Sequence, residues 1–91
     1  MKVRIELGEH RIVVEAHDPA GLLRATRLAA VERAPFLIKP AILSMSDLAF
    51  ATEIVRRSNA AHSRADPTPA SAERFLHWAV SRGYAVPLDE V

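Results

Sequence analysis

The side chains best suited to metal chemistry are four histidines, and they fall in different predicted elements: His10, His17, His62 and His77. A protein metal site needs several ligands that converge on one point. Glu73 and His77 lie four residues apart, so on a helix they would share one face and supply two ligands. The pattern offers no third ligand, and a solvated helix pair is the simpler interpretation. The sequence therefore predicts no metal site.

Catalytic motifs are equally scarce. The chain has no cysteine, which excludes a thiolate nucleophile, a thiolate metal site and a disulfide framework. With three glycines in total, it has no glycine-rich phosphate loop. Glu15, His17 and Asp18 could form an acid–base cluster, but Asp18 is better placed to cap the helix that follows. We expect no catalytic residue and no cofactor.

A basic patch lies at the end of the second predicted helix. Arg56, Arg57 and Arg64 lie there together with His62, and cations at a helix C-terminus also complement the helix dipole. This helix-end role is sufficient to explain the patch. The functional alternative is contact with phosphates or an acidic partner, so the three arginines are candidate partner-binding residues.

A second group of candidates surrounds the single tryptophan. Trp78 lies one helical turn from both Arg74 and Arg82, so either guanidinium could stack on the indole ring. Packing at the edge of the core is the favoured interpretation, because a large ring is rarely fully buried. The alternative is that Trp78, Arg74 and Arg82 anchor a binding surface.

The elements that must position these residues begin with a β-hairpin at residues 2–16. Apolar and charged side chains alternate there with the period of two typical of strands. A two-residue type II′ turn at Gly8 and Glu9 places apolar residues opposite apolar ones and acids opposite bases. The predicted pairs are Ile5 with Ile12, Val3 with Val14, Glu6 with Arg11 and Lys2 with Glu15. A four-residue loop at 8–11 would keep the apolar faces together but lose the Glu6–Arg11 pair.

Three helices are predicted after the hairpin. The leucines of the first do not form one narrow stripe, so either it is covered on more than one side or its predicted bounds are wrong. The third is expected to bury Phe75, Leu76, Ala79 and Val80. The helices span about 18–33, 46–62 and 69–82, and their predicted N-caps are Asp18, Ser44 or Ser46, and Thr68.

Two further segments have no regular pattern. Residues 35–43, PFLIKPAIL, contain two prolines, which exclude a regular helix interior and a central strand. We predict a short edge strand or an extended apolar crossover, and the apolar residues argue against an exposed loop. Residues 84–91 are predicted to be an extended tail. The fold class is therefore α+β, with an N-terminal hairpin packed on three helices in the order β-β-α-extended-α-α.

Length and composition narrow the function. A chain of 91 residues, 49% hydrophobic and 25% charged, is typical of one folded domain and not of a disordered chain. A net charge of +1 is too small to imply nucleic-acid binding by itself. The N-terminus lacks a signal-peptide pattern, and no apolar run approaches the length needed to cross a membrane. We therefore expect a cytoplasmic protein without membrane partners.

The predicted function is a non-catalytic protein-interaction or regulatory module. The size and the arginine- and alanine-rich composition would suit a phage or mobile-element accessory protein, encoded by a bacterial or phage genome. The alternative is a small nucleic-acid-binding regulator that uses the arginine-rich face of the first two helices, although neutral charge balance does not favour it. A small enzyme ranks third.

The expected partner is a protein, with a second copy of this chain as the first candidate. Val13 lies on the charged face of the hairpin, where an apolar residue makes sense if a partner covers it. A two-stranded sheet is marginal alone and leaves a strand edge open to another chain. The sequence therefore predicts a homodimer that forms through the hairpin.

Overall fold

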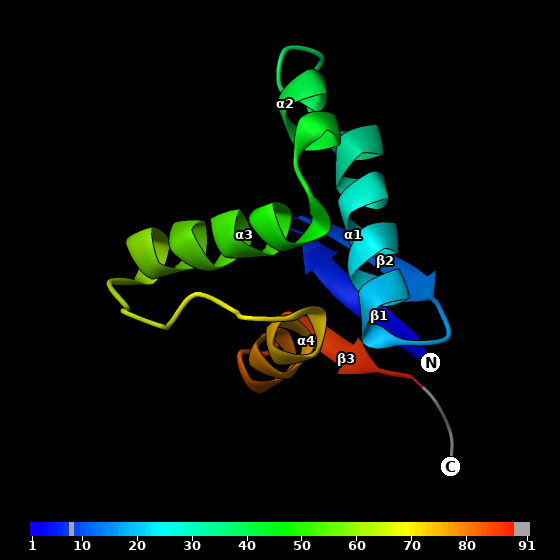
Figure 1. Ribbon diagram of the computed structural model, residues 1–91, viewed down its shortest axis with the longest axis vertical. Coiled ribbons are helices and arrows are strands. Elements are labelled where there is room, and N and C mark those ends of the chain that lie inside the picture. The colour runs from blue at the N-terminus through cyan, green and yellow to red at the C-terminus, as the bar shows by residue number, and fades with distance from the viewer. Residues whose placement is uncertain (8, 89–91) are drawn as a thin grey trace.

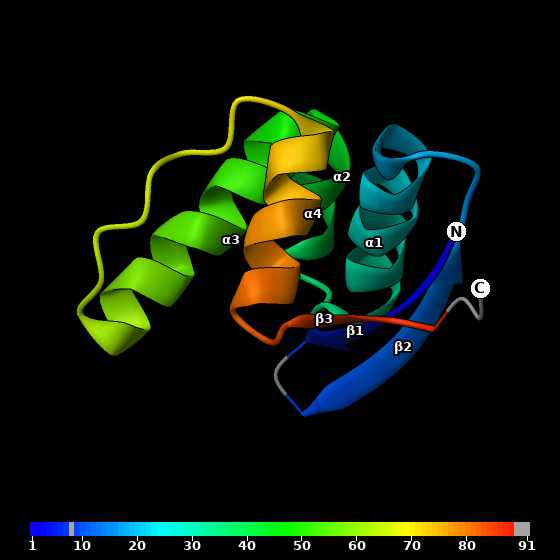
Figure 2. The same ribbon diagram turned by 90° about the horizontal axis from the view of Figure 1, so that it is seen from below.

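Three antiparallel strands form a sheet, and four helices lie on one side of it in the computed structural model, which describes residues 1–7 and 9–88. This arrangement confirms the predicted α+β class. Figure 2 shows the sheet as a single layer whose other face is not covered by any helix of the described residues. The elements are β1 (Lys2–Leu7), β2 (His10–Glu15), α1 (Pro19–Arg33), α2 (Lys39–Ser44), α3 (Asp47–His62), α4 (Ala72–Ser81) and β3 (Ala85–Pro87) (Figure 1).

The hairpin has the predicted register. Leu7 pairs with His10, so a two-residue connection joins β1 to β2, and the Glu6–Arg11 pair is kept with Nε and Oε1 3.6 Å apart. Gly8 lies outside the described residues, so the type II′ turn predicted there is not described. The remaining predicted partners also lie opposite one another: Ile5 and Ile12, Val3 and Val14, Lys2 and Glu15.

The third strand of the sheet comes from the C-terminal tail. Ala85–Pro87 is extended and pairs antiparallel with β1 in the sheet order β2-β1-β3. The backbone N–H of Leu88 donates to the carbonyl of Lys2 at 2.9 Å, which continues the pairing. The tail was predicted to be extended but not to be a strand. The last three residues of the predicted tail, 89–91, lie outside the described residues.

Two groups of buried side chains form the core. The sheet cluster lies between the sheet and helices α1 and α4, and the helix cluster lies among α1, α3 and α4. The sheet cluster contains Val3, Ile5, Ile12, Val14, Leu22, Ala79 and Ala85, and the helix cluster contains Leu23, Phe50, Ala51, Val55 and Phe75.

Helix α1 lies between the two clusters. Leu22 packs into the sheet cluster and Leu23 into the helix cluster, and both are almost fully buried. The Asp18 carboxylate accepts a hydrogen bond from the N–H of Gly21 at 2.8 Å, as expected of an N-cap. The absence of one apolar stripe therefore has a physical reason, because α1 is covered on more than one side.

The prediction of an extended segment at residues 35–43 is wrong. A turn at 36–38 leads into the short helix α2, in which Pro40 lies in the first helical turn. A proline is tolerated there because that N–H has no intrahelical acceptor. The N–H of Lys39 donates to the carbonyl of Pro35 at 3.1 Å, so helix-like backbone hydrogen bonding begins just before α2.

The predicted start is correct for α3 and wrong for α4. Helix α3 begins at Asp47, and the Ser46 hydroxyl caps it by accepting from the N–H of Ala49 at 3.1 Å. Helix α4 begins at Ala72 and not at residue 69, so the predicted cap at Thr68 is wrong. The Ser71 hydroxyl caps α4, because the preceding chain remains extended with Pro69 buried against the fold.

Candidate functional site

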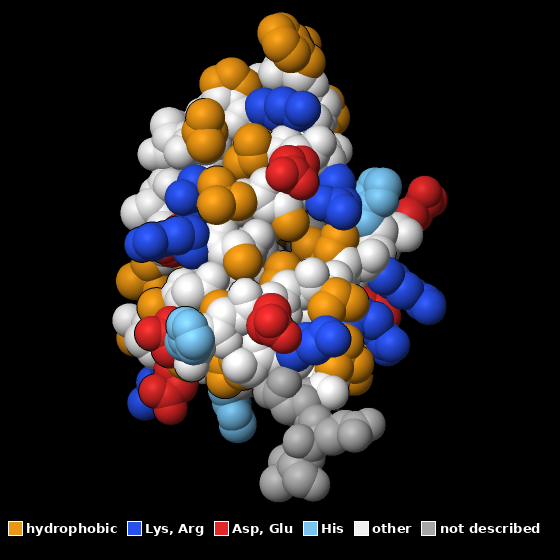
Figure 3. All heavy atoms as spheres, turned by 90° about the vertical axis from the view of Figure 1, so that its right-hand side faces the viewer, with side chains coloured by type: hydrophobic (Ala, Val, Ile, Leu, Met, Phe, Trp, Pro, Cys, Tyr) orange, Lys and Arg blue, Asp and Glu red, His pale blue; other side chains and the backbone are white. Residues whose placement is uncertain are grey.

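The two most exposed large apolar side chains of the described residues lie next to each other at one end of the molecule. Phe36 is 84% exposed and Leu37 is 89% exposed, and both lie in the turn before α2. We call this surface the apolar projection; it consists of Leu28, Phe36, Leu37, Ile38 and Leu43. Figure 1 shows α2 and this turn standing away from the sheet, and Figure 3 shows hydrophobic side chains at the same end. Monomeric proteins rarely expose such groups together unless the surface binds something.

The base of the projection is anchored to the fold. Ile42 and Met45 pack against the helix cluster, so one side of α2 faces the core. The Arg27 guanidinium donates from Nη1 to the carbonyl of Leu43 at 3.3 Å, which ties the end of α2 to α1. The tip is therefore presented by an ordered support and remains uncovered within the described chain.

Asp47 completes this anchor. Arg27 donates from Nε to the Asp47 carboxylate at 2.8 Å, and the Nε of Arg24 lies 3.4 Å from its other oxygen. The hydrogen bond from Arg27 is the main reason why the pKa of Asp47 is lowered from its ordinary value. Because Asp47 is the first residue of α3, its charge also stabilises that helix end.

The apolar projection was not among the predicted binding surfaces. The signal was present in the apolar run 35–43, but we interpreted that run as an argument against an exposed loop. In this segment Ile42 and Met45 pack against the helix cluster, whereas Phe36 and Leu37 remain exposed. Short apolar runs do not state which of their members face the core.

A second cluster of interactions centres on Asp66 and includes three predicted partner-binding residues. The indole Nε1 of Trp78 and the Nε of Arg82 each donate to one Asp66 oxygen at 2.9 Å. Arg64 lies 4.0 Å from the same carboxylate. Hydrogen bonds from Arg82 and then Trp78 lower the pKa of Asp66 from its ordinary value. The linker between α3 and α4 is thereby fastened to α4.

Trp78 is also enclosed by other aromatic rings. Its ring centroid lies 5.7 Å from that of Phe75 and 5.4 Å from that of Tyr84, at distances typical of favourable aromatic pairs. It contacts both the sheet cluster and the helix cluster. These contacts support the favoured interpretation of Trp78 as a residue at the edge of the core.

The remaining predicted arginines lie on separate surfaces. Arg56 and Arg57 each donate from Nε to the Glu53 carboxylate at 2.9 Å, so a neighbouring acid offsets their charge. Hydrogen bonds from Arg56 and Arg57 lower the pKa of Glu53 to about 2. Arg74 is exposed on α4 and forms no ion pair with the described residues. Among the described residues, Arg56, Arg57 and Arg74 form no ion pair with Asp66.

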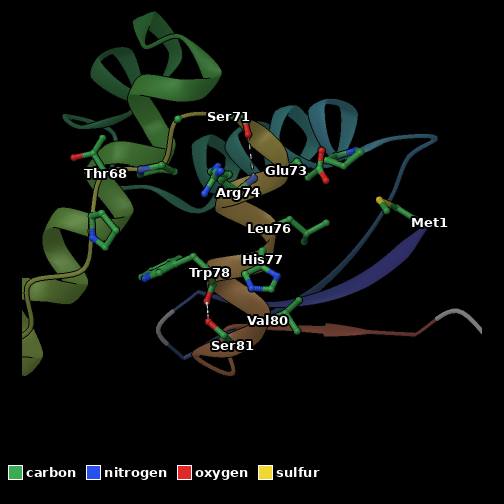
Figure 4. A pocket seen from close by; sticks show the side chains of 14 residues that line it. Met1, Thr68, Ser71, Glu73, Arg74, Leu76, His77, Trp78, Val80 and Ser81 are labelled. Atoms are coloured by element: carbon green, nitrogen blue, oxygen red, sulfur yellow. Dashed lines mark hydrogen bonds between the residues drawn. The ribbon is translucent and has the colours of Figure 1, made fainter.

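A shallow hollow lies along the outer face of α4, between this helix, the linker before it and Met1. Figure 4 shows Trp78 pointing from the helix toward the Thr68 segment, while Leu76 and Val80 point toward Met1. Val80 was predicted to be buried but is 39% exposed, because α4 presents this side to solvent. Glu73 and His77 also line the hollow. Within residues 1–7 and 9–88, no three His, Asp or Glu side chains gather in a way that could hold a metal ion.

Val13 lies on β2, which is an outer strand of the sheet. Its side chain is 55% exposed on the face that the helices leave open. The surroundings of Val13 are therefore different from those of every other predicted partner-binding residue, all of which lie on or beside α3 and α4.

Comparison with known proteins finds no family model, no curated protein and no solved structure that matches this chain. Among the described residues, no helix has both the length and the apolar character required to cross a membrane. The function therefore has to be argued from the surfaces of the protein itself.

Proposed function

We propose that the protein is a non-catalytic protein-interaction or regulatory module that docks through the apolar projection. The observation that carries the proposal is the exposure of Phe36 and Leu37 at the tip of an anchored support. Binding hot spots are typically large side chains that become fully desolvated in a pocket of the partner. A convex tip of this kind fits a concave apolar site. The cytoplasm remains the predicted compartment.

The charge beside the tip supports a particular chemistry for the partner. Lys39 follows the turn directly and forms no ion pair within the described part of the chain. Arg33 and Glu32 at the end of α1 lie 3.8 Å apart and largely offset each other. We infer that the partner is a protein that offers an apolar pocket with carboxylates at its rim.

Two other classes of partner have less support. Many of the arginines on which nucleic-acid binding would depend are engaged by Glu53, Asp47 and Asp66 within the fold. A lipid surface usually requires a second, electrostatic signal besides an apolar insertion, and a single free lysine beside the tip supplies little of it.

The test compares the wild-type chain with the Phe36→Ser/Leu37→Ser double variant and with Val80→Ser as a matched exposed control. A protein captured from nuclease-treated host lysate by the wild type is purified, and its Kd for all three chains is measured by calorimetry. Burying the two side chains stabilises a complex by about 3 kcal/mol or more, so the double variant should bind about 100-fold more weakly. Val80→Ser should keep the wild-type Kd.

Three results would contradict the proposal. Equal affinities of the double variant and the wild type would exclude the projection as the docking surface. Binding to vesicles of phosphatidylcholine and phosphatidylserine that depends on Phe36 and Leu37 would favour a membrane partner instead. A sub-micromolar, salt-sensitive complex with duplex DNA would favour the nucleic-acid alternative.

A further inference from the structure

Among residues 1–7 and 9–88, no strand pairs with the outer side of β2. In the sheet order β2-β1-β3, β1 is central. The opposite edge is formed by β3, which is three residues long and ends at Pro87. Short strands and prolines protect natural sheet edges, whereas β2 has six residues and no proline. It is therefore the edge most open to another strand.

The register determines which backbone groups face this open side. Leu7 pairs with His10 across the two-residue connection, and Met1 and Ala16 exchange backbone hydrogen bonds of 2.7 and 3.0 Å at the other end. Hydrogen-bonded pairs alternate with non-hydrogen-bonded pairs along two antiparallel strands. Because Ala16 is hydrogen-bonded to Met1, the backbone groups of every second residue before it, His10, Ile12 and Val14, also bond to β1. The N–H and C=O groups of Arg11, Val13 and Glu15 consequently point outward and are available to a further strand.

The side chains of these three residues form a self-complementary pattern. Arg11, Val13 and Glu15 are all exposed, and they project from the sheet face that carries no helix. The order along the strand is basic, apolar, acidic. When the same strand is placed antiparallel about its centre, the base meets the acid and the apolar residue meets itself.

We infer that two copies of this chain pair antiparallel along β2, about a two-fold axis at Val13. Val13 then lies opposite Val13 of the second copy, and Arg11 of each copy lies opposite Glu15 of the other. On the opposite face of the sheet, Ile12 lies opposite Val14, so apolar residues also meet there. The outward N–H groups of both strands all find carbonyl acceptors, and the two sheets become one continuous sheet.

Other registers are less favourable. A shift of one residue brings outward backbone groups opposite inward ones, so the hydrogen bonds are lost. A shift of two residues places Val13 opposite Glu15 or opposite Arg11, and both interchain ion pairs disappear. The symmetric charge pattern therefore selects one register as well as one partner.

This contact is separate from the apolar projection. Figure 1 shows α2 at the top of the molecule and β2 well below it, beside the lower end of α1. A dimer through β2 would therefore leave Phe36 and Leu37 of both copies exposed for their proposed partner, and the two proposals can fail independently.

Reversing the charge of Arg11 or Glu15 tests the inference. The mass of the species in solution is measured at several protein concentrations by light scattering behind a sizing column. The wild type should approach twice the 10.0 kDa of one chain as its concentration rises. Arg11→Glu and Glu15→Arg should each be monomeric, because each places like charges opposite one another across the axis. An equimolar mixture of the two variants should form a heterodimer, because acids then face bases at both positions.

The central position gives a second test with a matched control. Val13→Lys should raise the dimer Kd about tenfold or more, because two ammonium groups then meet at the axis. Val80→Lys, on α4, should leave the Kd unchanged. Circular dichroism checks that all variants are folded.

Several outcomes would overturn the inference. A single 10 kDa species at every concentration would exclude the dimer. A strand of a different protein would then be the remaining candidate to pair with β2. A dimer that survives Val13→Lys would exclude β2 from its interface. Folded Arg11→Glu and Glu15→Arg chains that fail to associate when mixed would refute the register.

Discussion

Two adjacent leucines of α1 provide the sharpest test of how this core is built. Leu22 is 2% exposed in the sheet cluster, and Leu23 is 3% exposed in the helix cluster. Consecutive residues point about 100° apart around a helix, and here each is buried in a different cluster, so α1 must be covered on two sides. Leu28, on the same helix, is 44% exposed and serves as a control for the same substitution.

The expected free energies follow from burial. Leu→Ala in a packed core destabilises by about 2–5 kcal/mol, so we expect Leu22→Ala and Leu23→Ala each to fall in this range. Full burial of a leucine contributes about 1.5–3 kcal/mol, and roughly half of Leu28 remains in water. Leu28→Ala should therefore destabilise by about 1 kcal/mol or less.

Urea denaturation followed by circular dichroism measures these differences. With an m-value of about 1 kcal/mol per molar urea, the two core variants should lose about 2 M or more of the midpoint and the control about 1 M or less. If Leu22→Ala or Leu23→Ala no longer folds while Leu28→Ala remains folded, the result still supports the burial of the substituted leucine. If either Leu22→Ala or Leu23→Ala behaves like the control, the two-sided burial of α1 is wrong.

Two further predictions concern acid and helix capping. Hydrogen bonds from Arg82 and Trp78 lower the pKa of Asp66, and hydrogen bonds from Arg56 and Arg57 lower the pKa of Glu53. The stabilising contribution of these carboxylates is complete above their ordinary pKa values of 3.8 and 4.5, and it is lost as the pH falls through the lowered values. The Tm should therefore fall between about pH 4.5 and pH 2, less steeply in Asp66→Asn; identical acid profiles would contradict this. Gly21→Ala should not raise the Tm despite a helix-propensity gain of about 1 kcal/mol, because the new Cβ would lie 3.0 Å from the Cβ of Ala16 and 3.2 Å from Oδ1 of the N-cap Asp18. A clear rise in Tm would show that this contact relaxes freely.

Local sequence determined the hairpin and the starts of two helices. The pairing of Ile5 with Ile12 and of Glu6 with Arg11 follows from a period of two and a short connection. Asp18 and Ser46 cap α1 and α3 because each is followed by a residue pattern that continues as a helix. These features depend on neighbours within a few residues, so the residue pattern and backbone stereochemistry were sufficient to predict them.

The candidate surfaces were predicted less completely. The sequence singled out Trp78, Arg82 and Arg64 as separate candidates, but not the acid on which they converge. Asp66 lies in a linker, and nothing in its local sequence indicates an indole and two guanidinium groups around it. Val13 was identified from the strand pattern, whereas its position at an open edge depends on β3 occupying the other side of β1.

The sequence by itself therefore determined the alternation of strands, the caps of α1 and α3, and the apolar composition of residues 35–43. Only the tertiary structure decided that the C-terminal tail supplies the third strand, that α4 begins at Ala72, and that Phe36 and Leu37 remain in solvent. The physical reason is competition for a limited core. Which apolar side chains are buried depends on the space left by segments distant in sequence, and here Ile42 and Met45 are the members of this segment that pack against side chains of α1, α3 and α4.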